Sequence, residues 1–490
     1  MSLKTQYTAL KGGLDLLSQP NTINPSRSLV AINYETPETG GYRSIKGYES
    51  LGAPTGEGPV LGLMVWDDTV FAIRSNGTNG ELYRYDFENT AWVSCGSGLP
   101  IGERYDFTIA NFLATDAEAL YMVCRAGKPW KYNGNVLTEI TAAQGGASFI
   151  TSHANHLMIG FREGSVQFSS LGEPEQWEAA TGAGEIGVSD RLNGFAKVQG
   201  GSLVIGCEDT IQVLYGTSAA DFELKELSSG VGVSPYTMQS IGTMPMFKTA
   251  KGLTSLQAAQ VYGDFQMGDF AKAIAPLFKD KAQPTCSMAS KNNNQYRLFF
   301  ADGTGIYATF VGETLSGITT ISFPHSVELA ASGNDSNGGD LNVFADADGN
   351  VYLLDQGTSF DGLPINTYLT LAYNHFSNPV LRKRFRRVIF DLVANSVVQI
   401  SVLPSYDFGN ERVPRHRVLF KDTLAQGGLW DFDNWDSFAW GSPLLDMSSM
   451  RLTGSGTHVS FVVNTSSTTA KQHTIHGYTT VYEARRISRG

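Results

Sequence analysis

The chain has 490 residues and a net charge of −11, with 36 Lys and Arg against 47 Asp and Glu. A general nucleic-acid binder normally carries a basic face, so this acidic balance argues against that class. Hydrophobic residues make up 42% and charged residues 17% of the sequence, which excludes global disorder. The 53 glycines and 11% aromatic residues indicate an all-β chain with many tight turns.

Membrane and export signals are not visible in the sequence. No apolar run approaches the ~18 residues of a membrane span, and Met1 to Lys11 has no apolar signal-peptide core. The four cysteines lie far apart and form no CxxC pair, which predicts free thiols in a reducing cytosol. We therefore expect synthesis in the cytoplasm and no direct membrane insertion.

Residues 1–55 form the first of three predicted regions. Their spacing of Pro and Gly favours an extended arm with short strands over a helix. Such an arm is expected to pack against the C-terminal region or against a neighbouring subunit.

Residues 56–364 contain a repeated hairpin, made of a β run, a short turn that usually carries Gly, and a second β run. A period of about 45 residues leaves room for four short strands, which is typical of a propeller blade. We predict a β-propeller of about seven blades, with six or eight as alternatives, and few helices, with the best candidates around 256–261 and 270–278. A long β-sandwich or a β-solenoid is the rival architecture. The landmarks of the seven turns are Gly80, Gly127, Gly164, Asp209, Gly252, Gly303 and Gly349.

Residues 365–490 read as further strands without the period, and they predict a β-sandwich-like docking domain. This region has 14 basic and 9 acidic residues, whereas the first 364 residues have 22 basic and 38 acidic ones. Opposite charges on the two regions suggest surfaces that face different partners.

A search for catalytic chemistry assigns no residues. The phosphate-loop, HExxH and GxSxG motifs are missing. The pairs His153/His156 and His473/His476 are three residues apart, a spacing that would point the rings to opposite faces of a strand. We therefore expect no enzyme activity, no metal and no cofactor.

Two clusters remain as candidate contact sites. The strongest charge run in the chain, from 382 to 387, could contact DNA phosphates or an acidic protein surface, and its basic members are Arg382, Lys383, Arg384, Arg386 and Arg387. The second is an aromatic and acidic stretch around Trp430, Trp435 and Trp440, which could stack on sugars or pack as a structural loop.

The layout of these segments resembles the tail nozzle (tail tube, or hub) proteins of short-tailed bacteriophages. The resemblance rests on Lys11-Gly-Gly-Leu-Asp15, on Asn33, on the run from Gly40 to Glu49, on the propeller-like repeats, and on the two late clusters. It covers nearly the whole chain, and its short motifs are moderately specific.

What the resemblance implies is a structural virion protein. By this resemblance, six copies would form a ring below the portal and a tail adaptor, or head-completion protein, and would contact tail fibre or spike proteins. Its acidic channel would retain the packaged double-stranded DNA without sequence specificity and release it on ejection. The location would be the virion tail. Two alternatives stay open: a phage receptor or glycan-binding propeller, and a cellular scaffold propeller.

Overall fold

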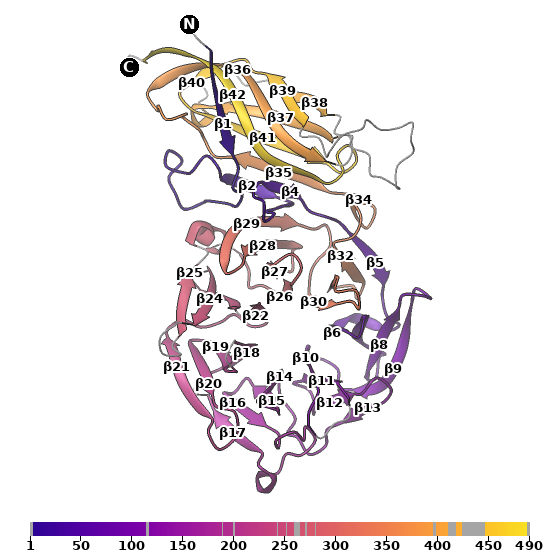
Figure 1. The fold of residues 1–490 in the computed structure, drawn as a ribbon. Helices are drawn as coiled ribbons and strands as arrows, with labels where there is room; N and C mark the ends of the chain where they lie inside the picture. Colours follow the sequence, from indigo (N-terminus) through magenta and orange to yellow (C-terminus); the bar gives the residue numbers. More distant parts are fainter. Residues whose placement is uncertain are drawn as a thin grey trace.

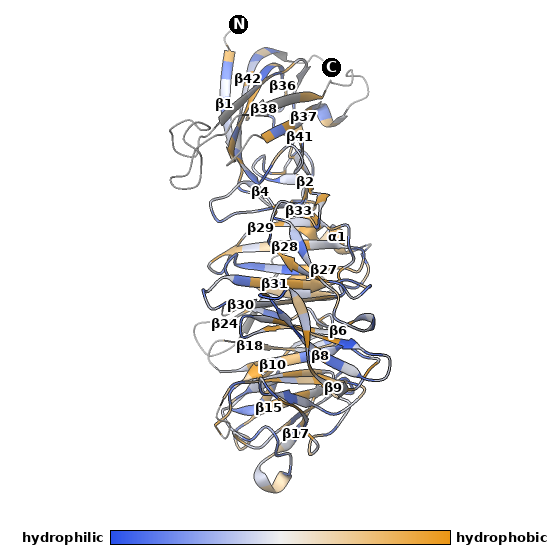
Figure 2. Ribbon diagram, turned by 90° about the vertical axis from the view of Figure 1, so that its right-hand side faces the viewer, coloured by the Kyte–Doolittle hydropathy of each residue, from blue (hydrophilic) through white to orange (hydrophobic). Residues whose placement is uncertain are grey.

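The computed structural model describes residues 3–113, 117–188, 190–198, 201–242, 244–250, 252–258, 265–269, 272–279, 281–394, 398–409, 418–423 and 446–487. These residues form a β-propeller with a β-sandwich attached to its rim, and both termini lie at the far end of the sandwich (Figure 1). Viewed from the side, the ring and the sandwich make one elongated body (Figure 2).

Six blades of the propeller each contain four consecutive antiparallel strands; five are separate sheets, and the sixth, β26 to β29, is one end of a nine-stranded sheet. The first three sheets are β6 (Glu57–Trp66), β7 (Thr69–Ser75), β8 (Gly80–Asp86) and β9 (Ala91–Leu99); β10 (Tyr105–Ala110), β11 (Ala119–Cys124), β12 (Trp130–Tyr132) and β13 (Leu137–Glu139); and β14 (Phe149–His153), β15 (His156–Phe161), β16 (Ser165–Phe168) and β17 (Gly184–Gly187). The next three are β18 (Leu192–Lys197), β19 (Leu203–Cys207), β20 (Thr210–Tyr215) and β21 (Glu223–Ser229); β22 (Gln239–Ile241), β23 (Met244–Thr249), β24 (Gly252–Ala258) and β25 (Phe265–Asp269); and β26 (Cys286–Ser290), β27 (Gln295–Phe299), β28 (Thr304–Val311) and β29 (Thr314–Ser322).

A composite sheet closes the ring. It contains β30 (Leu329–Asn334), β31 (Asp340–Ala345) and β32 (Val351–Leu354), and its fourth strand, β5 (Tyr48–Gly52), comes from the N-terminal segment. The short pair β33 (Ser359–Phe360) and β34 (Leu363–Pro364) continues it. The inner strand β30 packs against β26 on one side and β6 on the other, so the last sheet meets the first.

The predicted hairpins are confirmed as the two middle strands of successive sheets, from β7–β8 to β31–β32. The turn glycines are required where the chain has a positive φ and no room for a side chain. Gly164 has φ 98°, and a Cβ there would lie 2.8 Å from the carbonyl oxygen of Val188. The helix expected around 256–261 is wrong for its first residues, because Leu256 lies in β24. Near the second expected helix, the structure has η2 (Lys272–Ile274) and α1 (Ala275–Lys279).

The sandwich packs two sheets face to face. One contains β3 (Tyr34–Glu35), β4 (Tyr42–Ser44), β42 (His473–Ile487), β36 (Leu381–Ala394) and β39 (Asp446–Arg451), with β1 (Leu3–Ala9) paired to β42 and β40 (Ser455–Gly456) paired to β36. The other contains β2 (Ser28–Ile32), β35 (Asn366–Leu371), β41 (Val459–Ser466), β37 (Val398–Tyr406) and β38 (Leu419–Thr423). The ring of Phe461 contacts both Phe390 and Tyr478 of the facing sheet, with centroids 5.8 and 5.4 Å away. The single-turn helices η1 (Ala179–Thr181) and η3 (Asp407–Gly409) complete the described elements.

The N-terminal segment is part of both bodies. β2 joins β29 of the propeller to β35 of the sandwich, so one sheet of nine strands runs through both. β5 belongs to the ring, and the boundary expected at residue 55 therefore falls before Tyr48. The Tyr48 ring is fully buried and lies 5.0 Å from the rings of Phe344 and Phe360. Burial of this aromatic group favours docking of β5 in the ring.

Asn33 ties the junction together. It has a left-handed φ of 58°, which asparagine tolerates better than most residues. Its side-chain amide donates to the carbonyl of Asn366 at 2.8 Å and its Oδ1 accepts the N–H of Ser322 at 2.8 Å. These bonds hold the last strand of a blade, β29, and strand β35 of the sandwich at fixed positions.

Tyr34 of the N-terminal segment contacts the buried imidazole of His473 in β42, and this imidazole makes stability depend on pH. His473 is 2% exposed; its Nδ1 lies 3.1 Å from the Lys471 carbonyl oxygen and its Nε2 lies 3.1 Å from the Tyr34 hydroxyl. Because a carbonyl only accepts, Nδ1 carries the proton and Nε2 accepts from Tyr34. Burial lowers the pKa of His473 to about 4.

We expect acid to destabilise the protein through this group. Between pH 6.5 and 4 the unfolded chain binds a proton at His473 that the folded chain does not bind, so the free energy of unfolding falls as the pH falls. The slope from this one group is about 1.4 kcal/mol per pH unit. Urea unfolding at several pH values should show a shallower dependence in His473→Gln than in wild type; equal slopes would contradict the assignment.

Candidate interaction surface

The basic run at 382–387 lies on β36, and alternation along this strand divides its members. Arg382 and Arg384 are exposed, whereas Lys383 and Phe385 face the core. A register shift against β42 between Phe385 and Arg387 marks a β-bulge, and Arg387 is exposed beyond it. Successive residues of a strand point to opposite faces, so only part of the run lies on the surface.

Lys383 is a correction to the predicted contact site. The residue is 0% exposed, and its Nζ donates to the carbonyls of Asn378, Leu381 and Thr457 at 2.7, 2.9 and 3.0 Å. Burial lowers the pKa of Lys383 to about 8, although Asp407 acts against this shift. All three ammonium donors are used inside the sandwich, so this residue does not contact a partner across the outer face.

Arg386 is held by an acidic neighbour. Its guanidinium lies 2.9 Å from Glu483 Oε1 and 3.0 Å from Oε2, which makes a bidentate pair with β42. These hydrogen bonds lower the pKa of Glu483. The Arg386 side chain is 36% exposed, and its hydrogen bonds to Glu483 are contacts within the chain.

The remaining arginines belong to a larger surface. Residues directly opposite in neighbouring strands share a face, and the register pairs Arg387 with Arg451 of β39 and Arg384 with Glu483. Glu483 in turn pairs with Leu3 of β1. The exposed residues on this side define what we call the basic outer face: Leu3, Tyr7, Arg382, Arg384, Arg387 and Arg451.

This face combines positive charge with exposed apolar side chains. Arg387 and Arg451 are directly opposite each other in neighbouring strands, and like charges in this arrangement are unfavourable. Neither arginine forms an ion pair with another described residue. Leu3 and Tyr7 are 60% and 52% exposed beside them. Sequence reasoning missed Leu3, Tyr7 and Arg451, because only the strand register brings them next to the charge run.

The second predicted cluster, Trp430, Trp435 and Trp440, lies outside the described residues. The histidine prediction was wrong for one pair. His153 and His156 flank a two-residue turn and are directly opposite each other, so both rings pack on Phe222 instead of pointing apart. Within the described part of the chain, no three His, Cys, Asp or Glu side chains are grouped as metal ligands would be.

The propeller encloses an axial cavity of about 430 Å³. Each sheet of the ring contributes its inner strand to the wall, with residues from β6, β10, β14, β18, β22, β26 and β30. This volume lies in the range of small-molecule sites, roughly 300–1,000 Å³. A DNA duplex is much larger than this cavity, since its major groove alone is about 12 Å wide. The cavity of a single chain is therefore too small to hold a duplex.

The described residues include no helix that is long and apolar enough to span a membrane. No protein-family model and no curated protein matches the sequence.

Several solved structures are similar to this chain at low sequence identity. A structure of streptogramin B lyase has 12% sequence identity and a TM-score of 0.45, with 63% of this chain and 96% of that chain covered. The WD40 β-propeller domain of Doa1 has 13% identity and a TM-score of 0.43, with 63% and 97% covered. Raptor of Chaetomium thermophilum has 11% identity and a TM-score of 0.45, with 64% and 30% covered. The fold assignment itself rests on the strand pairing.

Proposed function

We propose that this chain is a structural subunit of the tail nozzle of a short-tailed bacteriophage, without enzymatic activity or a cofactor. The observation that carries the proposal is the basic outer face, an exposed surface without enough acidic partners of its own. Such a face suits docking onto the acidic surface of a tail adaptor. The sequence layout that resembles nozzle proteins adds independent support.

The junction between the two bodies supports a structural role in which force passes from one body to the other. A sheet that continues from β29 through β2 to β35 makes the sandwich an extension of one blade. Buried bonds from Asn33 fix that connection. A force or displacement at the docked sandwich would therefore reach the propeller without passing through a flexible linker.

The size of the axial cavity bears on where DNA would pass. Since one propeller cannot hold a duplex, genome retention and ejection require a channel between subunits, as in a ring of six copies. The net charge of −11 suits such a channel, because like charge lets phosphates slide past without tight contacts. In this proposal the protein is made in the host cytoplasm and ends in the virion tail, where fibre or spike proteins join it.

Quantitative mass spectrometry of purified particles from the source phage tests the proposal. We expect half as many copies of this chain as of the portal subunit, the ratio for a six-fold ring below a twelve-fold one. A higher ratio in multiples of three would instead favour the receptor or glycan-binding alternative. Absence from particles would reject the virion role and favour the cellular scaffold.

A further inference from the structure

The axial cavity is crossed at one mouth by an arginine. Arg104 lines the cavity just before β10, and its guanidinium carbon lies 3.9 Å from the ring centroid of Tyr236, which precedes β22. Its Nη1 donates to the carbonyl of Thr285, just before β26, at 2.7 Å. The inner strand β10 packs against β6 and β14, so the blades of β22 and β26 are not its neighbours. The Arg104 side chain therefore spans the axis and narrows this mouth.

Two lysines line the same cavity at its opposite mouth. Lys197 is the last residue of β18, and Lys291 directly follows β26. The described blades share one strand order that starts with the inner strand, so their inner strands run in the same direction along the axis. Residues at the ends of these strands therefore lie at the mouth away from Arg104, which precedes its strand.

Both lysines have donors to spare. The Nζ of Lys197 donates to the Ser152 hydroxyl at 2.8 Å, and the Nζ of Lys291 donates to Asn334 Oδ1 at 3.1 Å. Within the described part of the chain, neither lysine forms an ion pair with a carboxylate. An ammonium has three donors, and both residues are exposed, so two donors on each can reach a ligand.

The charge of the cavity lining is opposite to that of the whole chain. The chain has a net charge of −11, yet the charged residues that line the cavity are Arg104, Lys197, Lys291 and one acid, Asp106. Asp106 accepts the N–H of Ile150 at 2.9 Å, and the charge of Arg104 acts on its carboxylate. An anion at the other mouth therefore meets two positive lining groups, and low-dielectric walls strengthen this attraction.

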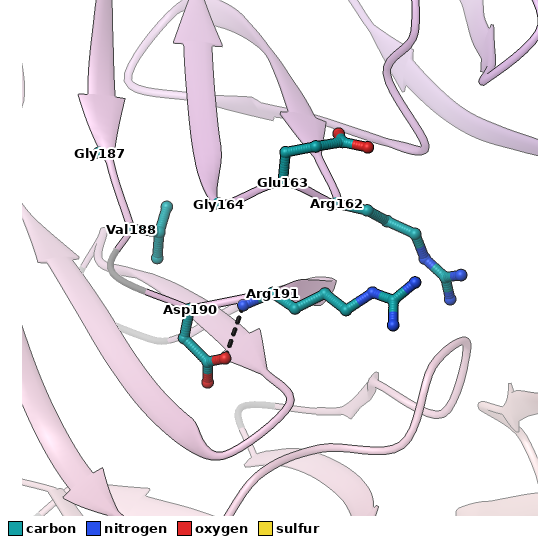
Figure 3. Close-up of a pocket in the computed structure, with 7 residues that line it drawn as sticks. All are labelled: Arg162, Glu163, Gly164, Gly187, Val188, Asp190 and Arg191. Atoms are coloured by element: carbon teal, nitrogen blue, oxygen red, sulfur yellow. Dashed lines mark hydrogen bonds between the residues drawn. The ribbon is translucent and has the colours of Figure 1, made fainter.

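A second pocket of the propeller lacks this excess of charge. Figure 3 shows that its lining combines two arginines with two acids, which are Arg162, Arg191, Glu163 and Asp190. The axial cavity is thus the better candidate for an anionic ligand.

The wall of the axial cavity also offers apolar surface. Met64, Phe107 and Phe195 line it and are partly exposed, and buried Met238 and Met288 line it as well. A small-molecule site typically joins an apolar wall to a few polar groups that fix the orientation of the ligand. The two lysines supply such groups at one end of this wall.

We propose that the axial cavity binds a small organic anion with an apolar body. Its carboxylate lies at the mouth with Lys197 and Lys291, and its body lies against Phe107, Phe195 and the methionines inside. Arg104 limits how far the body extends toward the other mouth. The site lies on the propeller, apart from the basic outer face, so it is independent of the nozzle proposal.

Isothermal titration calorimetry of the full-length chain tests the site. The anionic probes are benzoate and hexanoate. Benzyl alcohol and benzylamine keep the ring of benzoate but replace its negative charge, and acetate keeps the carboxylate without an apolar body. We expect at least one anionic probe to bind at least tenfold more tightly than each of these three comparison compounds.

Paired substitutions assign the binding to the two lysines. Lys197→Gln with Lys291→Gln should weaken binding of the anionic probe about tenfold or more and remove its advantage over benzyl alcohol. The matched control, Arg84→Gln with Lys225→Gln, removes two exposed positive charges from β8 and β21 and should leave the affinity unchanged.

Several results would overturn the proposal. It is wrong if neither benzoate nor hexanoate binds, if benzylamine binds as tightly as the anions, or if the two double variants have equal effects. Acetate that binds as tightly as the anionic probes would also reject it, because the apolar wall would then contribute nothing. Should the double lysine variant fail to fold, the single variants Lys197→Gln and Lys291→Gln decide by the same comparison.

Discussion

Replacing Asp355 with Ala should lower the free energy of unfolding by about 3–5 kcal/mol, the range for breaking a buried ion pair. Arg297 is 0% exposed and its Nη1 and Nη2 lie 2.7 and 3.1 Å from the Asp355 carboxylate. Without that carboxylate a guanidinium would stay buried and uncompensated, stacked 4.4 Å from the ring centroid of Tyr307. Urea unfolding followed by tryptophan fluorescence measures the loss.

Two further variants make this result specific. Glu175→Ala removes the acidic member of an exposed pair with Lys131, and it should cost less than about 1 kcal/mol. Arg297→Met combined with Asp355→Ala should be more stable than Asp355→Ala alone, because the stranded charge is gone. A double variant no more stable than the single one would show that the effect is loss of packing.

This ion pair belongs to a polar network at the junction. Gln295 accepts from Arg297 at 3.0 Å and donates to Glu35 at 2.8 Å, and Glu35 pairs with Arg43 at 2.7 Å. Asp355 also accepts from Asn342 of the composite sheet at 2.7 Å. The network therefore connects the arm, one blade and the closing sheet, and it fixes how the sandwich is mounted on the ring.

The repeated hairpins could be predicted because their signals are local. Alternating apolar runs and a turn residue such as Gly164 or Gly303 stand within about a dozen positions of each other. The strand that completes the ring has no local signal. β5 pairs with β32 about 300 residues later, and nothing in residues 48–52 names that partner. Long-range pairing of this kind depends on burial of Tyr48 among distant rings.

The basic outer face could be predicted only in part, because some of its signals are local in the sequence and others depend on long-range strand pairing. Charge density alone identified the run on β36, but it could not tell which residues face outward. The direction of Lys383 depends on where the alternation starts, and the exposure of Arg387 depends on the bulge that precedes it. The partners Leu3 and Arg451 come from opposite ends of the chain, so only the register of β1 and β39 shows them.

Reversing charge on the basic outer face should prevent assembly while leaving the fold intact. In Arg384→Glu with Arg387→Glu, both changes are at exposed positions without a buried contact, so the free energy of unfolding should change little. An acidic partner would then be repelled. We expect incorporation into particles to fall at least tenfold, measured by mass spectrometry as the ratio to the portal subunit.

A matched variant separates this surface from overall charge. Arg84→Glu with Lys225→Glu reverses two exposed charges on propeller strands β8 and β21 and should assemble normally. Normal incorporation of the Arg384 and Arg387 variant would reject the docking role. If particles formed normally but released their DNA abnormally, the arginines would contact phosphates instead. Docking through this face should also weaken as salt rises, because exposed charges are screened within about 10 Å at 0.1 M ionic strength.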